Sequence, residues 1–138
     1  MTTDNTADPG ASRQTMLLVD DNAQNLELLE VYMEDIPEVR VVTATNGIEA
    51  LERVAEESPD LILLDIMMPK MSGFEVCKRL KGDPNTRDII VVMVTALNEP
   101  GDVERAAECG TDDYISKPVD RKSLASLVRK MLATRNRA

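Results

Sequence analysis

Short runs of branched apolar residues alternate with longer amphipathic stretches along this chain of 138 residues. The runs at residues 16–19, 61–64 and 89–95 have the length and continuity of strands that are buried on both faces. Their alternation with helical patterns is typical of repeated βα units, which form parallel sheets covered by helices. Five such units fit the chain. We therefore predict an α/β fold with a doubly wound, five-stranded parallel sheet and five flanking helices.

The same patterns give the expected bounds of the elements. One strand, at residues 39–44, alternates in polarity and carries Arg40, so we expect it at an edge of the sheet. The predicted strands are 15–19, 39–44, 61–65, 89–95 and 114–116, and the predicted helices are 25–35, 46–58, 72–82, 100–110 and a last one from residue 121 onward.

Capping residues mark the ends of two helices. Asn46 with Glu49, and Ser72 with Glu75, have the spacing of a capping box, in which each side chain bonds the backbone of the other residue. Gly82 follows the second of these helices, and we predict that it is the C′ residue that ends it.

Length and composition predict one folded domain. The chain is 43% hydrophobic, enough for a single core at this length. Residues 1–14 are polar, contain Pro9 and Gly10 and lack an apolar run, so we expect a disordered tail and neither a signal peptide nor a membrane span. The predicted folded domain covers residues 15–133, and residues 134–138 are expected to be a C-terminal tail or the start of a linker.

Charge and cysteine content narrow the range of partners and compartments. A net charge of −9 argues against direct binding of nucleic acid, because phosphate contacts require clustered Lys and Arg. Cys77 and Cys109 lie in helical patterns and match no metal or redox spacing, so we expect reduced thiols and a cytoplasmic protein. No membrane partner is expected.

Polar residues follow the predicted strands where each strand ends. Asp65 closes one apolar run, and Asp20 and Asp21 close another. Thr95 and Lys117 stand at the ends of two further strands. Because the carboxyl ends of parallel strands lie along one edge of the sheet, these five side chains should meet there.

Such a cluster predicts a metal site beside a nucleophile. Three neighbouring carboxylates repel one another, and a hard divalent cation with oxygen ligands, Mg²⁺ with Mn²⁺ as an alternative, relieves that repulsion. Lys117 suits a phosphate oxygen and Thr95 offers a hydroxyl donor, so Asp65 is placed to accept a phosphoryl group. Taken singly, each residue has an ordinary structural alternative: Asp20 and Asp21 as an acidic helix cap, Asp65 and Lys117 as turn residues, and Thr95 as a common strand-end residue.

At these residues the chain resembles the receiver domain of two-component response regulators. The resemblance covers about residues 16–131, and within it the chain looks closest to receivers that stand alone or are linked to nucleotide cyclases. It implies a flavodoxin-like fold with strand order 2-1-3-4-5. The motifs that carry it, in the order and spacing of the family, are Val19-Asp20-Asp21, Leu64-Asp65-Ile66-Met67-Met68-Pro69, Val94-Thr95-Ala96 and Ser116-Lys117-Pro118.

The resemblance assigns roles to the acidic residues. Asp65 matches the phosphoacceptor of the family. Asp21, Asp65 and the backbone carbonyl of Met67 match its metal ligands, and Asp20 is expected to act partly through a metal-bound water.

The resemblance also implies a conformational relay. Lys117 matches the phosphate-binding lysine, whose peptide bond to the following residue, here Pro118, is usually cis in the family. Thr95 and Tyr114 match the switch pair. In that scheme the Thr95 hydroxyl moves to the phosphoryl group, the Tyr114 ring turns inward, and the surface of the fourth helix, fifth strand and fifth helix changes shape.

The chain contains no histidine, so a phosphohistidine donor has to belong to another protein. We expect a histidine kinase or histidine phosphotransfer protein as donor, a downstream protein or missing output domain as receiver of the signal, and a possible homodimer on phosphorylation. The expected activity is self-phosphorylation and self-dephosphorylation only. Two alternatives are a phosphohydrolase with an aspartyl nucleophile, disfavoured because Met67 occupies the position of its acid/base residue, and a degenerate receiver that only binds proteins.

Overall fold

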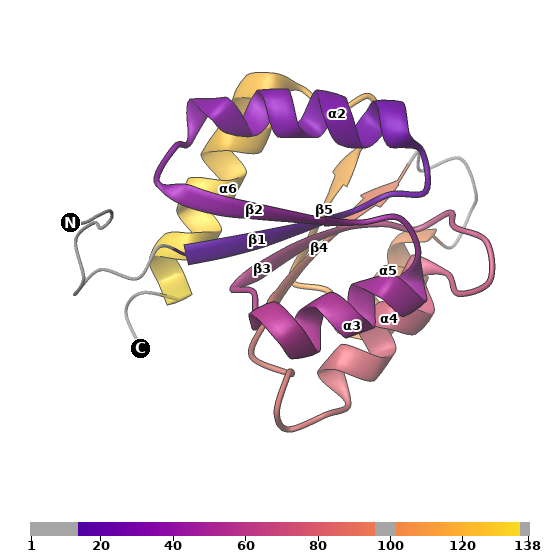
Figure 1. Cartoon of the computed structure of the whole chain (residues 1–138). Coiled ribbons are helices and arrows are strands. Elements are labelled where there is room, and N and C mark those ends of the chain that lie inside the picture. The colour runs from indigo at the N-terminus through magenta and orange to yellow at the C-terminus, as the bar shows by residue number, and fades with distance from the viewer. Residues whose placement is uncertain (1–13, 96–101, 136–138) are drawn as a thin grey trace.

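The structure, a computed structural model, describes residues 14–95 and 102–135. Its centre is a single parallel sheet with the strand order β2-β1-β3-β4-β5 (Figure 1). The fold class and strand order predicted from the sequence are therefore confirmed, and the strand that carries Arg40 lies at an edge as expected. The strands are β1 (Gln14–Val19), β2 (Val39–Ala44), β3 (Leu61–Asp65), β4 (Ile90–Thr95) and β5 (Asp113–Ser116).

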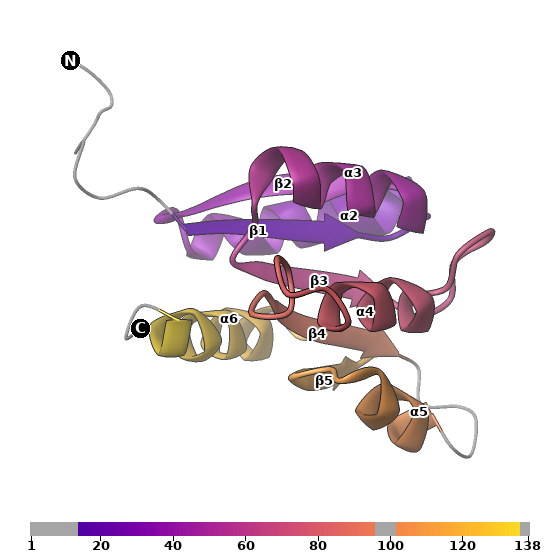
Figure 2. The same cartoon turned by 90° about the horizontal axis from the view of Figure 1, so that it is seen from below.

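Helices cover both faces of the sheet. One face carries α2 and α6, and the other carries α3, α4 and α5 (Figures 1 and 2). A 3₁₀ turn, η1, continues α2. The bounds are α2 (Ala23–Tyr32), η1 (Met33–Asp35), α3 (Gly47–Glu57), α4 (Gly73–Lys81), α5 (Asp102–Cys109) and α6 (Arg121–Arg135).

The two faces of the sheet form two separate apolar clusters. Along β1, Leu17 and Val19 pack under α3 and α4, whereas Met16 and Leu18 pack under α2 and α6. All five residues of β3 and all six of β4 are buried, which explains why these strands have continuous apolar sequences and no polar alternation. The polar residues of the central strands are consequently confined to their ends.

The ends of the sheet differ slightly from the sequence-based bounds. Gln14, expected in the N-terminal tail, belongs to β1: it pairs with Val39, and its side-chain amide donates a hydrogen bond to the carbonyl of Leu132 at 3.1 Å. The predicted helix 25–35 consists of α2 and η1, and α6 extends to Arg135, two residues beyond the predicted domain boundary. Residues 100 and 101 of the predicted helix 100–110 lie outside the described residues.

The predicted starts of α3 and α4 are correct, but their capping bonds are not reciprocal. Asn46 and Ser72 accept hydrogen bonds from the N–H groups of Glu49 and Glu75, at 2.8 and 3.3 Å. The Glu49 carboxylate bonds Thr45, one residue before the cap, and the Glu75 carboxylate bonds Arg79 within its own helix. The side-chain cap is thus the part of the motif that the sequence predicted correctly.

The prediction for Gly82 is wrong. Gly82 is the C-cap of α4 with φ −85°, in the right-handed region. The last carbonyls of α4 are satisfied by the turn that follows, where the Thr86 hydroxyl donates to the carbonyl of Leu80 at 2.7 Å. A left-handed residue is therefore not needed there, although Gly110, with φ 87°, provides one after α5.

No helix within the described residues has both the length and the apolar character that a membrane crossing requires.

Candidate functional site

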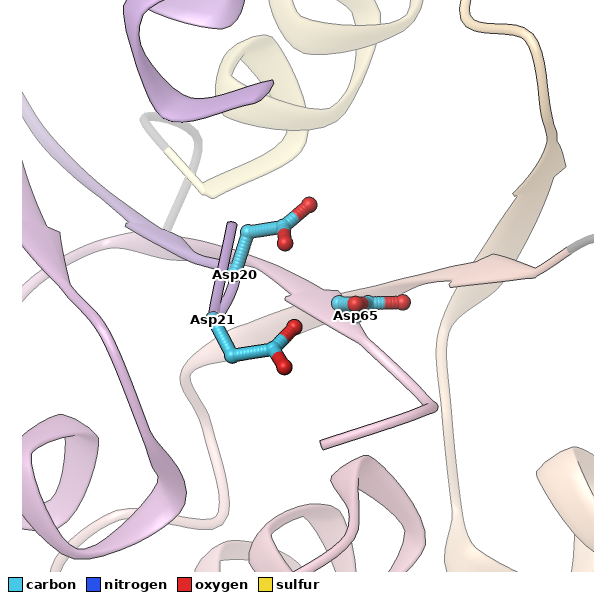
Figure 3. A group of neighbouring side chains, drawn as sticks. All are labelled: Asp20, Asp21 and Asp65. Carbon is cyan, nitrogen blue, oxygen red and sulfur yellow. The ribbon is translucent and has the colours of Figure 1, made fainter. Parts of the chain in front are cut away.

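Three carboxylates meet at the edge of the sheet where β1 and β3 end. Asp65 is the last residue of β3, and Asp20 and Asp21 follow β1 directly. Because Val19 pairs with Leu64 in the parallel register, the two strand ends lie level with each other. Oxygen atoms of the three side chains lie within 4.8 Å of one another, and Figure 3 shows the three carboxylates on the same side of the strand ends. The sequence predicted this convergence.

Two of the three acids are buried. Asp20 is 4% exposed and Asp65 is 3% exposed, whereas Asp21 is exposed. Backbone and side-chain donors at the start of α2 hold Asp20: the N–H of Asn22 bonds Oδ1 at 2.9 Å, and the amide of Asn25 bonds Oδ2 at 3.3 Å. Asp20 is therefore fixed in position, while Asp21 remains open to solvent.

Lys117 brings a positive charge to the site from the other side of β4. Its Nζ lies 3.3 Å from Oδ1 of Asp65, and the same oxygen accepts a hydrogen bond from the N–H of Met67 at 3.4 Å. The peptide bond between Lys117 and Pro118 is cis, as the resemblance implied. The ammonium group and a backbone amide thus flank the carboxylate that the sequence singled out.

The surroundings of Asp65 make its ionised form less favourable than that of a carboxyl in water. Burial raises the pKa of the Asp65 carboxyl above its ordinary value, and the neighbouring charge of Asp20 raises it further. The ammonium of Lys117 and the N–H of Met67 lower this pKa, but burial is the largest cause. A bound divalent cation would reverse the balance, since it favours the ionised carboxylate.

The donor set fits a hard cation. All three acids offer oxygen ligands. Asp20 and Asp65 are buried, and the repulsion between buried carboxylates is only weakly screened by water and salt. Lys117 offsets only one negative charge. Mg²⁺ usually binds through a few carboxylates and keeps several of its water ligands. This cluster suits such binding, because Asp21 is exposed and leaves room for water beside the ion.

Thr95 and Tyr114 lie on the neighbouring strands β4 and β5. Thr95 is the buried last residue of β4, and its carbonyl accepts a hydrogen bond from the N–H of Lys117 at 2.8 Å. Tyr114 lies on β5 opposite Met93 and is 41% exposed. Ala96, the next residue in the motif, lies outside the described residues.

Gly73 is a residue at the site that the sequence analysis did not single out as functional. A Cβ atom added to Gly73 would lie 2.4 Å from the carbonyl oxygen of Asp65 and 2.8 Å from the Cα of Ile66. Its N–H donates to the carbonyl of Ile66 at 3.0 Å. The start of α4 therefore packs directly on the backbone of Asp65. The glycine after the Ser72 cap was the available signal, but only the structure shows what it approaches.

A pocket of about 390 Å³ opens beside the acidic cluster. Asp20, Asn25 and Lys117 supply its polar wall, and α2 supplies half of the residues of its apolar wall. Its lining residues are Asp20, Asn25, Leu28, Leu29, Tyr32, Val94, Lys117, Pro118 and Val119.

Fold and sequence together define the class of protein. A family model, the response regulator receiver domain, matches residues 16–129. The chain belongs to this family, and it is a signalling receiver domain of two-component response regulators.

Individual relatives agree with this assignment. The chain is 45% identical to the response regulator PleD of Caulobacter vibrioides over 116 residues, which are 84% of this chain but 25% of PleD. The chain thus spans about a quarter of that relative.

Solved structures show the same fold. The signal receiver domain of a signal transduction histidine kinase from Syntrophus aciditrophicus superposes with a TM-score of 0.85 at 38% identity, covering 91% of this chain and 94% of the other. The receiver domain of the sensor histidine kinase PA1611 from Pseudomonas aeruginosa has a TM-score of 0.80 at 27% identity, covering 88% of this chain and 99% of the other. That structure holds a magnesium ion in its active site cleft.

Proposed function

We propose that this domain accepts a phosphoryl group on Asp65. The observation that supports the proposal best is the placement of a buried carboxylate between two further acids and an ammonium group, with Lys117 Nζ 3.3 Å from Asp65 Oδ1. An aspartate with a purely structural role would need neither the two further acids nor the ammonium group beside it. The arrangement provides a nucleophile, a cation site and a fixed positive charge for a phosphoryl oxygen.

Mg²⁺ is the proposed cofactor, with Mn²⁺ as a substitute. Asp21, Asp65 and the backbone carbonyl of Met67 would hold the ion, and Asp20 would act partly through a bound water. When bound, the ion supplies charge neutralisation for the phosphoryl group and the carboxylates. The magnesium ion in the PA1611 receiver supports this assignment by similarity.

The proposed donor is a phosphohistidine on a histidine kinase or a histidine phosphotransfer protein. An Asp65 oxygen attacks the phosphorus atom, the phosphorus–nitrogen bond breaks, and its electron pair stays on the donor imidazole. Lys117 holds a phosphoryl oxygen during this transfer. The pocket between α2 and Pro118 leaves one side of the site open to the donor.

Phosphorylation would then be relayed through Thr95 and Tyr114. The Thr95 hydroxyl would bond the phosphoryl group, and the Tyr114 ring would turn inward from its exposed position, changing the surface of α5, β5 and α6. The exposed Tyr114 ring of this structure suits the state before phosphorylation.

The output of the domain would pass to another polypeptide segment. PleD extends well beyond the part that this chain matches, so a linked output domain or a separate downstream protein is the proposed recipient, with a homodimer formed on phosphorylation. The domain itself would catalyse only its own phosphorylation and dephosphorylation. We propose a cytoplasmic location, in line with two cysteines that are not disulfide-bonded in this structure.

A phosphohydrolase with an aspartyl nucleophile is the weaker candidate. Such an enzyme needs an acid two residues after the nucleophile, and that position holds Met67, whose side chain is apolar and 78% exposed. Turnover of a phosphate ester would revive this alternative.

Acetyl phosphate provides a direct test, because it supplies a phosphoryl group without a partner protein. Incubation with acetyl phosphate and Mg²⁺ should add the mass of one phosphoryl group, and chelation of the metal should prevent the addition. Asp65→Asn should abolish it. Asp60→Asn is the matched control. Asp60 lies just before the amino end of β3, whereas Asp65 lies at its carboxyl end, so this substitution should leave labelling intact.

Persistent labelling of Asp65→Asn at another carboxylate would overturn the assignment. A second experiment replaces acetyl phosphate with a phosphorylated histidine phosphotransfer protein and follows the loss of its label. Transfer to the wild-type domain, and none to Asp65→Asn, is the expected result.

A further inference from the structure

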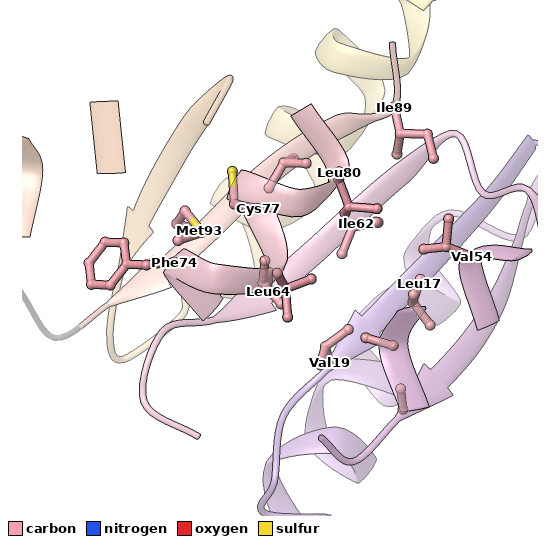
Figure 4. Close-up of a cluster of buried hydrophobic side chains, with 14 of the residues drawn as sticks. Leu17, Val19, Val54, Ile62, Leu64, Phe74, Cys77, Leu80, Ile89 and Met93 are labelled. Carbon is pink, nitrogen blue, oxygen red and sulfur yellow. The ribbon is translucent and has the colours of Figure 1, made fainter. Parts of the chain in front are cut away.

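The two cysteines of the chain lie next to each other although 32 positions separate them. Cys77 lies on α4 and its sulfur is fully buried in the apolar cluster shown in Figure 4, which also contains Leu80 and Met93. Cys109 is the last residue of α5 and packs against the same cluster. The thiol of Cys77 donates a hydrogen bond to the carbonyl of Cys109 at 3.4 Å.

The two side chains are also close enough to influence each other electrostatically. Burial raises the pKa of the Cys77 thiol to about 12, and the charge of an ionised Cys109 is the next cause. The Cys77 thiol therefore stays protonated and reacts slowly with an oxidant, so the first oxidation falls to Cys109, and Cys77 reacts only with a sulfenic acid held beside it.

The geometry leaves a short distance to close. The carbonyl oxygen and the sulfur of one cysteine both lie within about 3 Å of its own Cα. The 3.4 Å contact from the Cys77 sulfur to the Cys109 carbonyl therefore keeps the two sulfur atoms within about 9 Å of each other, and a disulfide requires rotation of the side chains and a shift of the α5 end to close that gap. Cys109 suits such a shift because the helix ends there, with Gly110 in the left-handed conformation.

Access to the two thiols is unequal. A pocket of about 230 Å³ between α4 and α5 reaches Cys109, with Phe74, Lys78 and Glu108 among its lining residues. Cys109 is half-buried and Cys77 is closed off inside the core. A small oxidant from solvent would therefore meet Cys109 first.

We propose that Cys109 and Cys77 form an intramolecular disulfide when the domain is exposed to a hydroperoxide. The Cys109 sulfur attacks the peroxide, the oxygen–oxygen bond breaks, and Cys109 becomes a sulfenic acid as the peroxide is reduced to water or an alcohol. The Cys77 sulfur then displaces the hydroxyl group from Cys109, which leaves as water with the thiol proton. Two thiols and one peroxide give one disulfide.

The disulfide would join α4, which begins on the backbone of Asp65, to α5, which belongs to the proposed output surface. If the proposed function holds, this link restrains α5 and weakens the response to phosphorylation without removing a site residue. Oxidation would then act as a second input to the same domain.

The test treats the whole chain with hydrogen peroxide, blocks the remaining thiols and maps the disulfide by tryptic digestion under non-reducing conditions. The expected product is residues 71–78 linked to residues 106–121, lost on reduction. Cys109→Ser should leave Cys77 unoxidised. Cys77→Ala should instead accumulate sulfenic or sulfinic acid on Cys109.

Several outcomes would overturn the proposal: dimers linked between two chains, Cys109 oxidised to sulfinic acid without linkage in the wild type, or linkage that forms no faster in the folded domain than in urea. The mapping uses no phosphodonor, so it stands or fails independently of Asp65. Labelling of oxidised and reduced protein by acetyl phosphate then measures the effect on the proposed function separately.

Discussion

Asp112→Ala should destabilise the domain well beyond what an exposed aspartate usually contributes. Oδ2 of Asp112 accepts hydrogen bonds from the N–H of Val91 and from Nζ of Lys81, both at 2.8 Å. The N–H of Asp112 donates to the carbonyl of Val91, also at 2.8 Å. Lys81 uses its other two donors on the carbonyls of Arg87 and Ile89, at 3.0 and 2.8 Å. Asp112 therefore connects β4, the end of α4 and the start of β5.

The magnitude follows from which groups lose a partner. Val91 is fully buried, so its N–H would lose its partner away from water, at a cost of about 1–3 kcal/mol. The ion pair between Lys81 and Asp112 is partly exposed, at 17% and 37%, and contributes about 1 kcal/mol or less. We expect Asp112→Ala to lower the free energy of unfolding by about 2–3 kcal/mol. Asp112→Asn, which keeps an acceptor oxygen, should lose about 1 kcal/mol.

Urea unfolding followed by circular dichroism measures these differences. The control is Arg79→Ala, which breaks the exposed ion pair between Arg79 and Glu75 on α4 and should change stability by less than about 0.5 kcal/mol. If Asp112→Ala were no more costly than this control, the Val91 bond would not carry the stability assigned to it. Equal losses for Asp112→Ala and Asp112→Asn would show that charge, and not the hydrogen bond, dominates.

Three further predictions concern the site itself. Gly73→Ala should cost about 3 kcal/mol in urea unfolding, because its Cβ would overlap the backbone of Asp65, whereas Gly82→Ala, whose Cβ would lie 3.1 Å from its nearest neighbour, should stay within about 1 kcal/mol of wild type. Asp65→Asn should raise the urea midpoint at neutral pH in the presence of a chelator. The pKa of Asp65 is raised in the folded state, so wild type gains stability relative to this variant as the pH falls through that pKa. The difference in urea midpoint between the two proteins should therefore shrink in acid, and a difference that is constant with pH would contradict the reasoning. Mg²⁺ at ten times its dissociation constant should stabilise wild type by about 1.4 kcal/mol and Asp65→Asn by clearly less, as measured by thermal or urea unfolding.

The sequence was sufficient for the sheet and for the acidic edge because both follow from periodicity. A run such as residues 61–64, apolar at every position, is typical of a strand buried on both faces, and such strands form parallel sheets with helices on each side. Once strands are parallel, residues that end them share an edge, so Asp20 and Asp65 meet without any knowledge of loops. Lys117 follows by the same argument.

Residues outside this edge were harder to interpret. Asp112 lies in a polar stretch after Gly110, and nothing in the local sequence marks Val91 or Lys81 as its partners. Gly82 fits the usual pattern for a left-handed helix end, but the Thr86 hydroxyl satisfies the carbonyl that such a residue would otherwise serve. Each of these contacts depends on the path of a connecting segment, which periodicity does not specify.

The two cysteines combine a contact between elements that the sequence predicts with a contact between side chains that it does not. Because β3 and β4 are neighbours, and right-handed crossovers put the helices that follow them on the same face, α4 and α5 had to lie side by side. The order of the elements therefore predicts that the two helices are neighbours, although the spacing of Cys77 and Cys109 along the sequence suggested no relation between them. The order of strands and helices along the chain does not determine how each helix is rotated about its own axis. That rotation is set by Leu80 and Phe74 packing onto the sheet, and it turns the Cys77 sulfur toward the end of α5.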